Sequence, residues 1–352
     1  MPPKGHKKAH KHILVLRLSA MGDVAMTVPV IRALVQQHTH IRVTVVSRQQ
    51  YRSFFEGLPR VNFFEADLKK RHKGFFGLLR LYKDLKALHV TAVADLHNVT
   101  RTKLITRLFA FRGKKVGTTD KMRPERAKLT ALKNKVFEPM PAVIERHAQV
   151  FLQLGYPVNL SNPVFPVAQP LTDDITGHTG PKTGKWIGIA PFAQHRGKVY
   201  PKELINEVID SLAAHAGTTL LLFGGGKEET RLLDKYAAGH PNIIVVAGGA
   251  FTLKQELIII SHLDVMLSMD SANAHMAAMQ GTKVVTLWGA THPYAGFSPF
   301  NQPDSNALTA SREQYPLLPT SIYGNKIVEG YEGAMHTIAP QAVVQKVIEL
   351  IG

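Results

Sequence analysis

Apolar runs of strand length alternate with helix-like stretches through the first part of the chain. The run HILVLRL over 12–18 has the length of a buried strand, and the β-branched run IRVTVVS over 41–47 fits a second. A helix-like stretch over 24–37 separates them, and residues 75–89 have a helical period that leads into the strand-like run 90–95. This order of elements predicts a parallel, doubly wound α/β sheet.

The amino-acid composition changes over 161–185, where prolines are interleaved with Gly, Thr and Asp. Such a composition predicts a linker, and after it the alternation of strands and helices starts again. We therefore expect an α/β fold of two Rossmann-like, doubly wound domains over 13–160 and 186–338, which face each other across a cleft at the carboxyl ends of their strands. A disordered basic tail over 1–12 and a terminal helix over 339–352 complete the predicted organisation.

Charge is divided unequally between the two halves of the chain. Residues 1–160 hold 30 Lys and Arg against 10 Asp and Glu, and residues 161–352 hold 13 against 16, which together give the formal net charge of +17. The excess in the first half predicts that the first domain meets an anionic partner, which could be nucleic acid, anionic lipid or an acidic glycan. The alternative interpretation is a charge that only promotes solubility.

Composition excludes several classes of protein. The chain has no cysteine, so it has neither a disulfide framework nor a thiolate metal site, and this fits a reducing cytoplasm. No apolar run approaches the roughly 20 residues of a membrane span. There is no G-x-G-x-x-G motif after the first strand and no Asp-x-Asp at a strand end, so we expect neither a nicotinamide or flavin cofactor nor a required metal ion.

The loop after the first predicted strand is the first candidate site. Gly22 would let the backbone approach a ligand closely, and Asp23 lies at the mouth of the predicted cleft. Asp23 could also be a plain N-cap of the helix that follows, because a carboxylate satisfies free backbone amides there.

The segment MDSANAHMAAMQG over 269–281 follows another strand and continues as a helix. Asp270 suits the N-cap, and the amides of Ser271, Ala272 and Asn273 would then point at an incoming anion. The alternative is a capped structural helix without a ligand, in which His275 is a buried core imidazole.

Two further strand ends carry polar side chains. Lys198, in the loop APFAQHRGK, could neutralise a diphosphate leaving group, or it could be solvated surface charge. Glu228 follows the run Gly224–Gly226 and could accept hydrogen bonds from ribose hydroxyls.

Together these segments resemble the heptosyltransferases of lipopolysaccharide core synthesis, which form glycosyltransferase family 9, have a GT-B fold and use ADP-heptose donors. The resemblance extends from about Ile13 to Pro299 and is carried by ILVLRLSAMGDV, APFAQHRGKVYP and MDSANAHMAAMQGTKVVTLWGATHP. It departs from the family at Ala272 and Asn273, where glycine and proline are common.

The resemblance implies an inverting, metal-independent transfer of a heptose or related sugar from a nucleotide diphosphate, with ADP-heptose as the expected donor, to an anionic lipopolysaccharide core. Asp23 would be the general base and Lys198 would contact the diphosphate. The donor phosphates would also meet Ser19, Gly22, Asp270, Ser271, Ala272 and Asn273. Glu228 falls near the ribose-binding carboxylate of the family and Phe251 near its nucleobase wall.

The acceptor would meet the basic first domain. Arg101 matches an acceptor-side position of the family, and Arg123 and Arg126 belong to a basic cluster over 112–135 that could grip an anion. We expect a cytoplasmic monomer with peripheral contact at the inner membrane and no nucleic-acid partner. Two rival hypotheses are a non-enzymatic binder of nucleic acid or anionic surfaces, and a sugar-nucleotide epimerase on the same scaffold.

Overall fold

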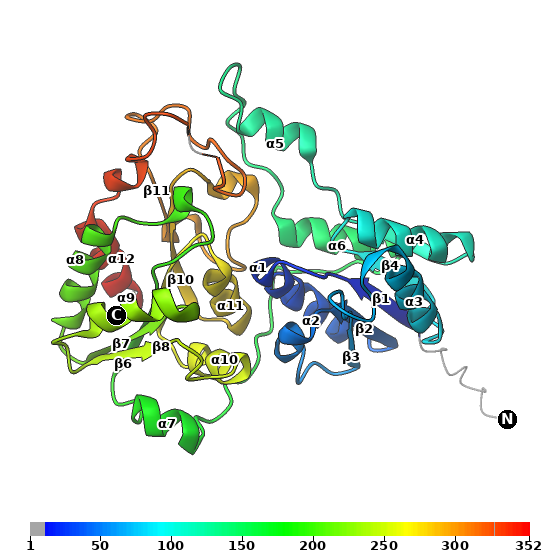
Figure 1. Ribbon diagram of the computed structural model, residues 1–352, viewed down its shortest axis with the longest axis horizontal. Coiled ribbons are helices and arrows are strands. Elements are labelled where there is room, and N and C mark those ends of the chain that lie inside the picture. Colours follow the sequence, from blue (N-terminus) through cyan, green and yellow to red (C-terminus); the bar gives the residue numbers. More distant parts are fainter. Residues whose placement is uncertain (1–10, 327) are drawn as a thin grey trace. The chain divides into compact units, whose positions relative to one another are not determined.

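The computed structural model describes residues 11–326 and 328–352 and divides into two compact units (Figure 1). Unit 1 comprises the chain up to Lys121 together with Val143–Val164, and unit 2 comprises Met122–Ala142 and Phe165–Gly352. Of the predicted basic tail over 1–12, the first ten residues lie outside the described part, whereas Lys11 and His12 already belong to the first strand.

Unit 1 is built on a parallel five-stranded sheet in the order β3-β2-β1-β4-β5. Its strands are β1 (Lys11–Leu16), β2 (Ile41–Ser47), β3 (Val61–Glu65), β4 (Ala92–Asp95) and β5 (Lys115–Thr118). The strands are separated by α1 (Met21–Ala25), α2 (Thr27–Gln37), the 3₁₀ turn η1 (Gln49–Phe54), α3 (Gly74–Lys86) and α4 (Thr100–Phe111), and α6 (Val143–Leu154) follows the last strand. The predicted doubly wound topology is confirmed, with the order reversing beside β1.

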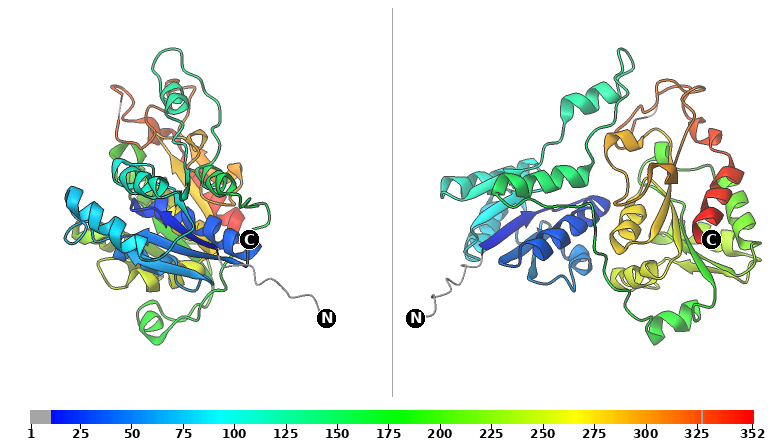
Figure 2. Two further views of the ribbon diagram at one scale, coloured as in Figure 1. Left: turned by 90° about the vertical axis from the view of Figure 1, so that its right-hand side faces the viewer. Right: turned by 180° about the vertical axis from the view of Figure 1, so that it is seen from behind.

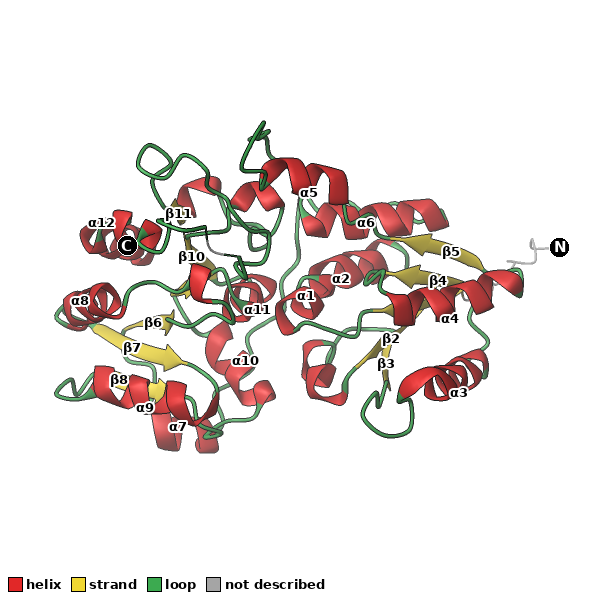
Figure 3. Cartoon of the chain, turned by 45° about the horizontal axis from the view of Figure 1, so that its top comes forward, coloured by secondary structure: helices red, strands yellow, loops and turns green. Residues whose placement is uncertain are grey.

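Side chains alternate across the sheet of unit 1, and each set meets its own layer of helices. Leu14 and Leu16 of β1 share one core with Leu81 of α3 and Ile105 of α4. The helices α2 and α6 pack on each other and against the other face of the sheet (Figure 3). Both faces are therefore covered, as parallel sheets require.

Unit 2 contains a parallel six-stranded sheet in the order β11-β10-β9-β6-β7-β8. Its strands are β6 (Lys185–Ala190), β7 (Thr218–Phe223), β8 (Ile243–Val246), β9 (Val265–Met269), β10 (Lys283–Trp288) and β11 (Ala307–Thr309). Its longer helices are α8 (Lys202–Ala213), α9 (Gly226–Ala237), α10 (Leu253–Ser261), α11 (Ala272–Gln280) and α12 (Pro340–Ile351). Short 3₁₀ turns are η2 (Arg196–Lys198), η3 (Pro293–Ala295), η4 (Asp304–Asn306) and η5 (Ala334–Thr337).

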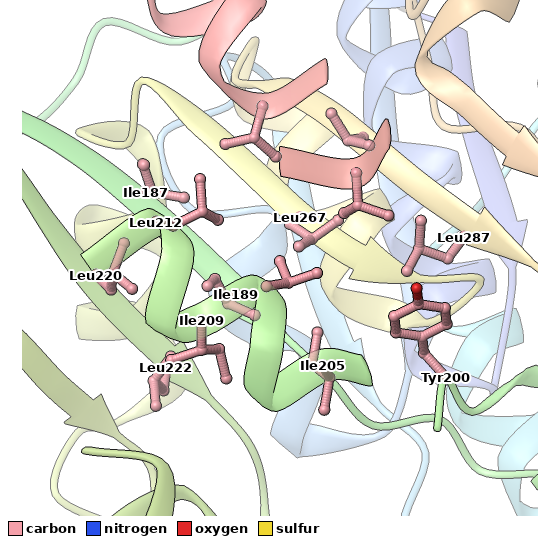
Figure 4. Close-up of a cluster of buried hydrophobic side chains, with 14 of the residues drawn as sticks. Ile187, Ile189, Tyr200, Ile205, Ile209, Leu212, Leu220, Leu222, Leu267 and Leu287 are labelled. Atoms are coloured by element: carbon pink, nitrogen blue, oxygen red, sulfur yellow. The ribbon is translucent and has the colours of Figure 1, made fainter. Parts of the chain in front are cut away.

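The core of unit 2 shows why these segments form their elements. Ile205, Ile209 and Leu212 recur at helical spacing on α8 and pack onto Ile187 and Leu267 of the sheet (Figure 4). Helical spacing places apolar side chains on one face, and burial of that face stabilises the helix far more than its intrinsic propensity does.

The segment 161–185 is not a bare linker. It holds α7 (Asp173–Thr179), whose Ile175 is buried, and the chain passes into unit 2 after Val164. The prolines and glycines on both sides masked this short helix in the sequence.

Residues 122–142, which we call the strap, pack with unit 2 and not with the first domain, where we expected them. The strap carries α5 (Arg123–Leu129) and returns through a loop (Figure 2). Phe137 lies against the rings of His292 and Tyr294, with centroids 4.9 and 4.6 Å away, and the Arg312 guanidinium lies 3.4 Å from its ring centroid. The amide of Met140 also donates to the Tyr294 carbonyl at 2.9 Å. The strap packs with unit 2 because the ring of Phe137 finds its aromatic partners there.

Among the described residues, no helix combines the length and the apolar character that crossing a bilayer requires.

Candidate functional site

Asp23 lies in the first turn of α1, directly after the loop that ends β1. Its Oδ2 is 2.5 Å from Arg17 Nη2 and accepts the Ala20 amide at 3.3 Å, while 27% of its side chain stays exposed. Asp23 is thus the third residue of the helix and not its N-cap, although it satisfies the N-cap amide. Capping and a role toward a ligand are compatible, because the carboxylate still reaches solvent.

Arg17 is the residue that fixes this carboxylate, and sequence reasoning missed it. Its Nη1 donates to the Leu96 carbonyl at 2.6 Å, and the backbone carbonyl of Arg17 accepts the Ser47 hydroxyl at 2.6 Å. A cation in an otherwise apolar strand run was the available signal, because a buried charge requires a partner.

The end of β4 lies beside the end of β1, since Leu16 pairs with Asp95 in the parallel register. Asp95 Oδ1 accepts the amides of His97 and Asn98 at 3.0 and 2.8 Å, and burial raises the pKa of this carboxyl. Burial and the nearby Arg17 guanidinium lower the pKa of His97 to about 3. The imidazole is therefore neutral at physiological pH, and its Nδ1 can accept the Leu18 amide at 3.4 Å.

The other candidates of unit 1 lie at this same edge. Ser19 and Gly22 are half-buried in the loop that carries Asp23, and Arg101 is exposed in the first turn of α4, just after β4. The structure thus brings Ser19, Gly22, Asp23 and Arg101 to the carboxyl ends of two neighbouring strands, where ligands bind in parallel sheets.

In unit 2, Lys198 and Asp270 form a largely buried ion pair. Lys198 Nζ lies 3.0 Å from Asp270 Oδ2, and the Thr291 hydroxyl donates to the same oxygen at 2.9 Å. Lys198 ends η2, after β6, and Asp270 follows β9; these strands are neighbours in the sheet. Solvated surface charge is therefore the wrong interpretation of Lys198.

The start of α11 differs from our expectation in one respect. Ser271, in an extended conformation, is the N-cap, and α11 begins at Ala272. Asp270 precedes the cap and its amide still donates to the Leu287 carbonyl at 3.3 Å, so it extends the sheet. The Ser271 hydroxyl hydrogen-bonds with Ser268 Oγ at 3.0 Å. The amides of Ala272 and Asn273 lie in the first helical turn, where backbone donors lack an intrahelical acceptor.

Close backbone approaches hold Lys198 in place. A Cβ atom at Gly324, whose φ is +77°, would lie 2.3 Å from Lys198 Cγ. The Ala290 amide donates to the Gly197 carbonyl at 2.8 Å, and a Cβ at Gly289 would lie 2.7 Å from that oxygen. Both glycines let the chain press against the turn that carries the lysine. These contacts arise only in the folded chain, so sequence reasoning missed Gly324 and Thr291.

The remaining candidates of unit 2 lie apart from this pair in the sequence. Glu228 is exposed in the first turn of α9, where its neighbour Glu229 accepts the Gly225 amide at 2.7 Å. Phe251 is only 8% exposed and packs edge to face on His178 of α7 with centroids 5.0 Å apart. His275 is buried in α11. The ring of Phe251 therefore offers a base little surface in this conformation.

Arg123 and Arg126 do not share a unit with Arg101. Both lie on α5 of the strap, which packs with unit 2. Arg126 Nη1 donates to the Tyr323 hydroxyl at 2.8 Å, and its guanidinium lies 5.3 Å from the Phe297 ring centroid. The predicted acceptor cluster is thus divided between units, because the aromatic side chains of unit 2 hold Arg126 by hydrogen bonding and cation–π contact.

Comparison with known proteins places these features in a family. The sequence pattern of glycosyltransferase family 9 (heptosyltransferase) matches residues 78–321. Lipopolysaccharide core heptosyltransferase OpsX of Haemophilus influenzae is 24% identical over 307 residues, which cover 85% of this chain and 84% of that protein. The glycosyl transferase family 9 structure from Veillonella parvula covers 97% of both chains with a TM-score of 0.75 and 20% identity. Escherichia coli heptosyltransferase WaaC with ADP covers 96% of this chain and 99% of that chain, with a TM-score of 0.70 and 19% identity.

Proposed function

We propose the reaction from one premise, namely that this chain belongs to glycosyltransferase family 9 and is a glycosyltransferase. The proposed reaction is transfer of a heptose from ADP-heptose to an anionic lipopolysaccharide core, since its relatives include a lipopolysaccharide core heptosyltransferase and the Escherichia coli ADP-heptose lps heptosyltransferase II. The family match does not favour a non-enzymatic polyanion binder or an epimerase.

The observation that carries the proposal is the Lys198–Asp270 pair beside the start of α11. A diphosphate gains negative charge as it leaves, and a fixed ammonium with open first-turn amides stabilises charge at that moment. Asp270 would hold Lys198 in place without touching the phosphate itself, because two anions repel. The Thr291 hydroxyl supports this role, since it donates to the same carboxylate oxygen at 2.9 Å.

Asp23 is the proposed general base. The acceptor oxygen attacks the anomeric carbon, its proton passes to Asp23, and the bond from that carbon to the diphosphate breaks with its electron pair on the leaving ADP. A single displacement of this kind inverts the anomeric configuration. Arg17 supports the assignment because it orients the carboxylate at 2.5 Å while leaving part of it open to solvent.

The finer assignments remain part of the proposal. Ser19 and Gly22 would meet the donor phosphates from unit 1. Glu228 would meet the donor nucleoside, and Phe251 would do so only through the small exposed part of its ring. Arg101 would bind the acceptor, and Arg123 and Arg126 would do so from the strap. We propose a cytoplasmic monomer that contacts the inner membrane peripherally and requires no metal ion.

The test measures release of ADP from ADP-heptose with a deacylated lipopolysaccharide core as the soluble acceptor, with and without EDTA. We expect turnover that depends on the acceptor and persists with EDTA. UDP- and GDP-sugars are tested as alternative donors under the same conditions. Turnover with one of them but not with ADP-heptose would overturn the donor assignment, and loss of turnover with EDTA would overturn metal independence.

A further inference from the structure

The outward surface of the α3–α4 layer of unit 1 combines exposed aromatic rings with cations. We propose that this surface docks on an anionic lipid bilayer. We call it the α3–α4 face and define it by Phe75, Phe76, Lys83, Lys103, Arg107 and Phe111. The inference rests on the proposed peripheral membrane contact and assigns that contact to a specific surface.

Three phenylalanines give the α3–α4 face its apolar component. Phe75 is 59% exposed, Phe76 76% and Phe111 89%. The rings of Phe75 and Phe76 lie edge to face, with centroids 5.7 Å apart. Single exposed apolar side chains are ordinary, but Phe75 and Phe76 form one contiguous apolar contact, and Phe111 adds a second apolar site on the same layer. A phenylalanine ring has no polar atom, so the partner must offer an apolar environment.

Helical spacing directs these side chains away from the sheet. On α3, Leu78, Leu81 and Leu85 enter the core, whereas Phe76 and Lys83 stay exposed. On α4, Ile105 and Phe109 are buried, whereas Lys103, Arg107 and Phe111 are exposed. Tyr82 of α3 meets Phe109 of α4 at 5.0 Å between centroids, so the helices form one continuous layer (Figure 3).

The two helices run in the same direction, because each connects parallel strands of the same sheet. Phe75 and Phe76 therefore stand near the opposite end of the layer from Phe111, which ends α4. The cations Lys83, Lys103 and Arg107 lie between these ends along the sequence of each helix. The surface is therefore extended, with apolar side chains at both ends and cations between them. Such a surface suits a flat partner that contacts its whole length better than a ligand that contacts one point.

The charge around the α3–α4 face is strongly positive. Residues 69–115 contain 13 Lys and Arg against two acidic residues, Asp84 and Asp95. Asp84 is engaged by Arg71 at 2.8 Å and by His72 at 3.2 Å, and Asp95 is buried in β4. The two acidic groups therefore offset only a small part of this positive charge, and the remaining excess complements anionic lipid headgroups.

A bilayer explains both components, whereas a polyanion in water explains only one. Cations interact with headgroup phosphates while their stems and the aromatic rings enter the apolar boundary, as in interfacial amphipathic helices. Duplex nucleic acid or an acidic glycan would satisfy the cations but would leave rings at both ends of the layer in water, whereas the bases of a single strand could stack on the rings, which is why the test below includes single-stranded RNA. The observations therefore favour the bilayer.

The test is co-sedimentation of the full chain with vesicles of phosphatidylcholine alone and of phosphatidylcholine with phosphatidylglycerol. Two variants alter the α3–α4 face: Lys83→Gln/Lys103→Gln/Arg107→Gln and Phe76→Ser/Phe111→Ser. Matched controls remove equal charge from exposed positions of unit 2, by Lys202→Gln/Arg231→Gln/Lys235→Gln, and two other exposed apolar side chains of unit 1, by Leu152→Ser/Val164→Ser. Turnover of a soluble deacylated acceptor is measured in parallel.

We expect the wild type to bind the anionic vesicles and to be released by salt. The charge variant should bind them on the order of 100-fold more weakly at low salt, because each cation near the surface contributes to the attraction. The aromatic variant should bind at least about tenfold more weakly. Both controls should bind as the wild type does, and turnover of the soluble acceptor should not change.

Each other result overturns a distinct statement. If the wild type binds neither vesicle, the membrane contact itself is wrong, while turnover still reports on the transferase. If the wild type binds but both face variants bind equally well, the contact lies elsewhere. If the charge variant loses binding to heparin or single-stranded RNA but keeps its affinity for vesicles, the surface serves a soluble polyanion instead.

Discussion

The ammonium of Lys198 lies 3.0 Å from the carboxylate of Asp270, and this carboxylate also accepts the Thr291 hydroxyl. A carboxylate at a proposed phosphate site is at first sight unfavourable, because it repels the ligand. The geometry resolves this, since Asp270 is engaged with the lysine and the threonine. The pair therefore fixes the position of one cation, as the proposed action on a developing charge requires.

Removing the carboxylate tests this positioning role. Asp270→Asn keeps an oxygen that can accept from Thr291 but loses the ion pair, so we expect kcat to fall while donor affinity holds or rises. Donor Kd from calorimetry and kcat from ADP release separate the two effects. The donor Kd of Lys198→Ala is measured in parallel. If Asp270→Asn weakens donor binding as much as Lys198→Ala does, Asp270 is in direct contact with the donor.

Lys198 is expected to act on the leaving group. Lys198→Ala should lower kcat by roughly 10²–10³, the usual cost of losing one donor to a developing anion. Lys198→Arg should restore part of the rate, because the charge is kept while the geometry changes. Steady-state kinetics of the three proteins provide the measurement, and an unchanged rate in the alanine variant would remove Lys198 from the mechanism.

Asp23→Asn should abolish turnover and leave ADP binding intact, because the amide cannot take the acceptor proton. The matched control is Glu56→Gln, an acidic residue that lies in the segment between η1 and β3 of the same unit. Turnover above about a tenth of the wild-type rate would show that Asp23 is not the base, since general base catalysis typically contributes 10²–10⁴-fold.

Arg101 and Arg126 are expected to respond differently to the same substitution. Arg101 is exposed, so Arg101→Ala should raise the acceptor KM without changing the unfolding temperature or the donor affinity. Arg126 is engaged by Tyr323 and Phe297, so Arg126→Ala should also destabilise unit 2, by roughly 1 kcal/mol. Thermal unfolding and acceptor titrations of both variants decide this, and equal unfolding temperatures would contradict the packing role of Arg126.

The stability of the protein should depend on Glu256 in α10. Burial raises the pKa of Glu256 to about 7 from its ordinary value of 4.5. Because the pKa of Glu256 is higher in the folded state than in the unfolded state, its protonation contributes to the free energy of unfolding. This contribution is complete below pH 4.5 and is lost as the pH rises through 7. Glu256→Gln should therefore remove at most about 3 kcal/mol of pH dependence across this window. Urea unfolding at several pH values, with exposed Glu228→Gln as the control, measures it.

Much of the fold could be predicted because its signals are local. Runs such as 41–47 are β-branched and apolar, and the helices between them bury one face, so element types follow from periodicity. The helix α7 was missed because glycine and proline surround it. The strap was misplaced for a different reason: its cations resemble those of unit 1, whereas its position follows from Phe137 and the rings it meets on unit 2.

In the candidate site, too, the residues with a local sequence signal could be predicted, whereas those that depend on distant contacts could not. Asp23, Lys198 and Asp270 stand at strand ends, which a sequence reveals. Their partners are distant in the chain: Thr291 bonds Asp270 across 21 positions, and Gly324 makes room for Lys198 from 126 positions away (324 − 198). Arg17 is only six positions from Asp23 (23 − 17), but its burial emerges from the packing of β1 between β2 and β4. Non-local contacts of this kind leave no periodic signal.

The strap has a consequence for how this protein can be recombined. The polypeptide changes units after Lys121, after Ala142 and again after Val164, so neither unit is one continuous stretch of gene. A chimera joined to another family member at residue 165 alone would pair Arg312 and His292 with a foreign strap and discard Phe137. Interchangeable modules of this enzyme therefore need matched junctions on both sides of residues 122–142, and donor-specificity swaps should carry that insert along.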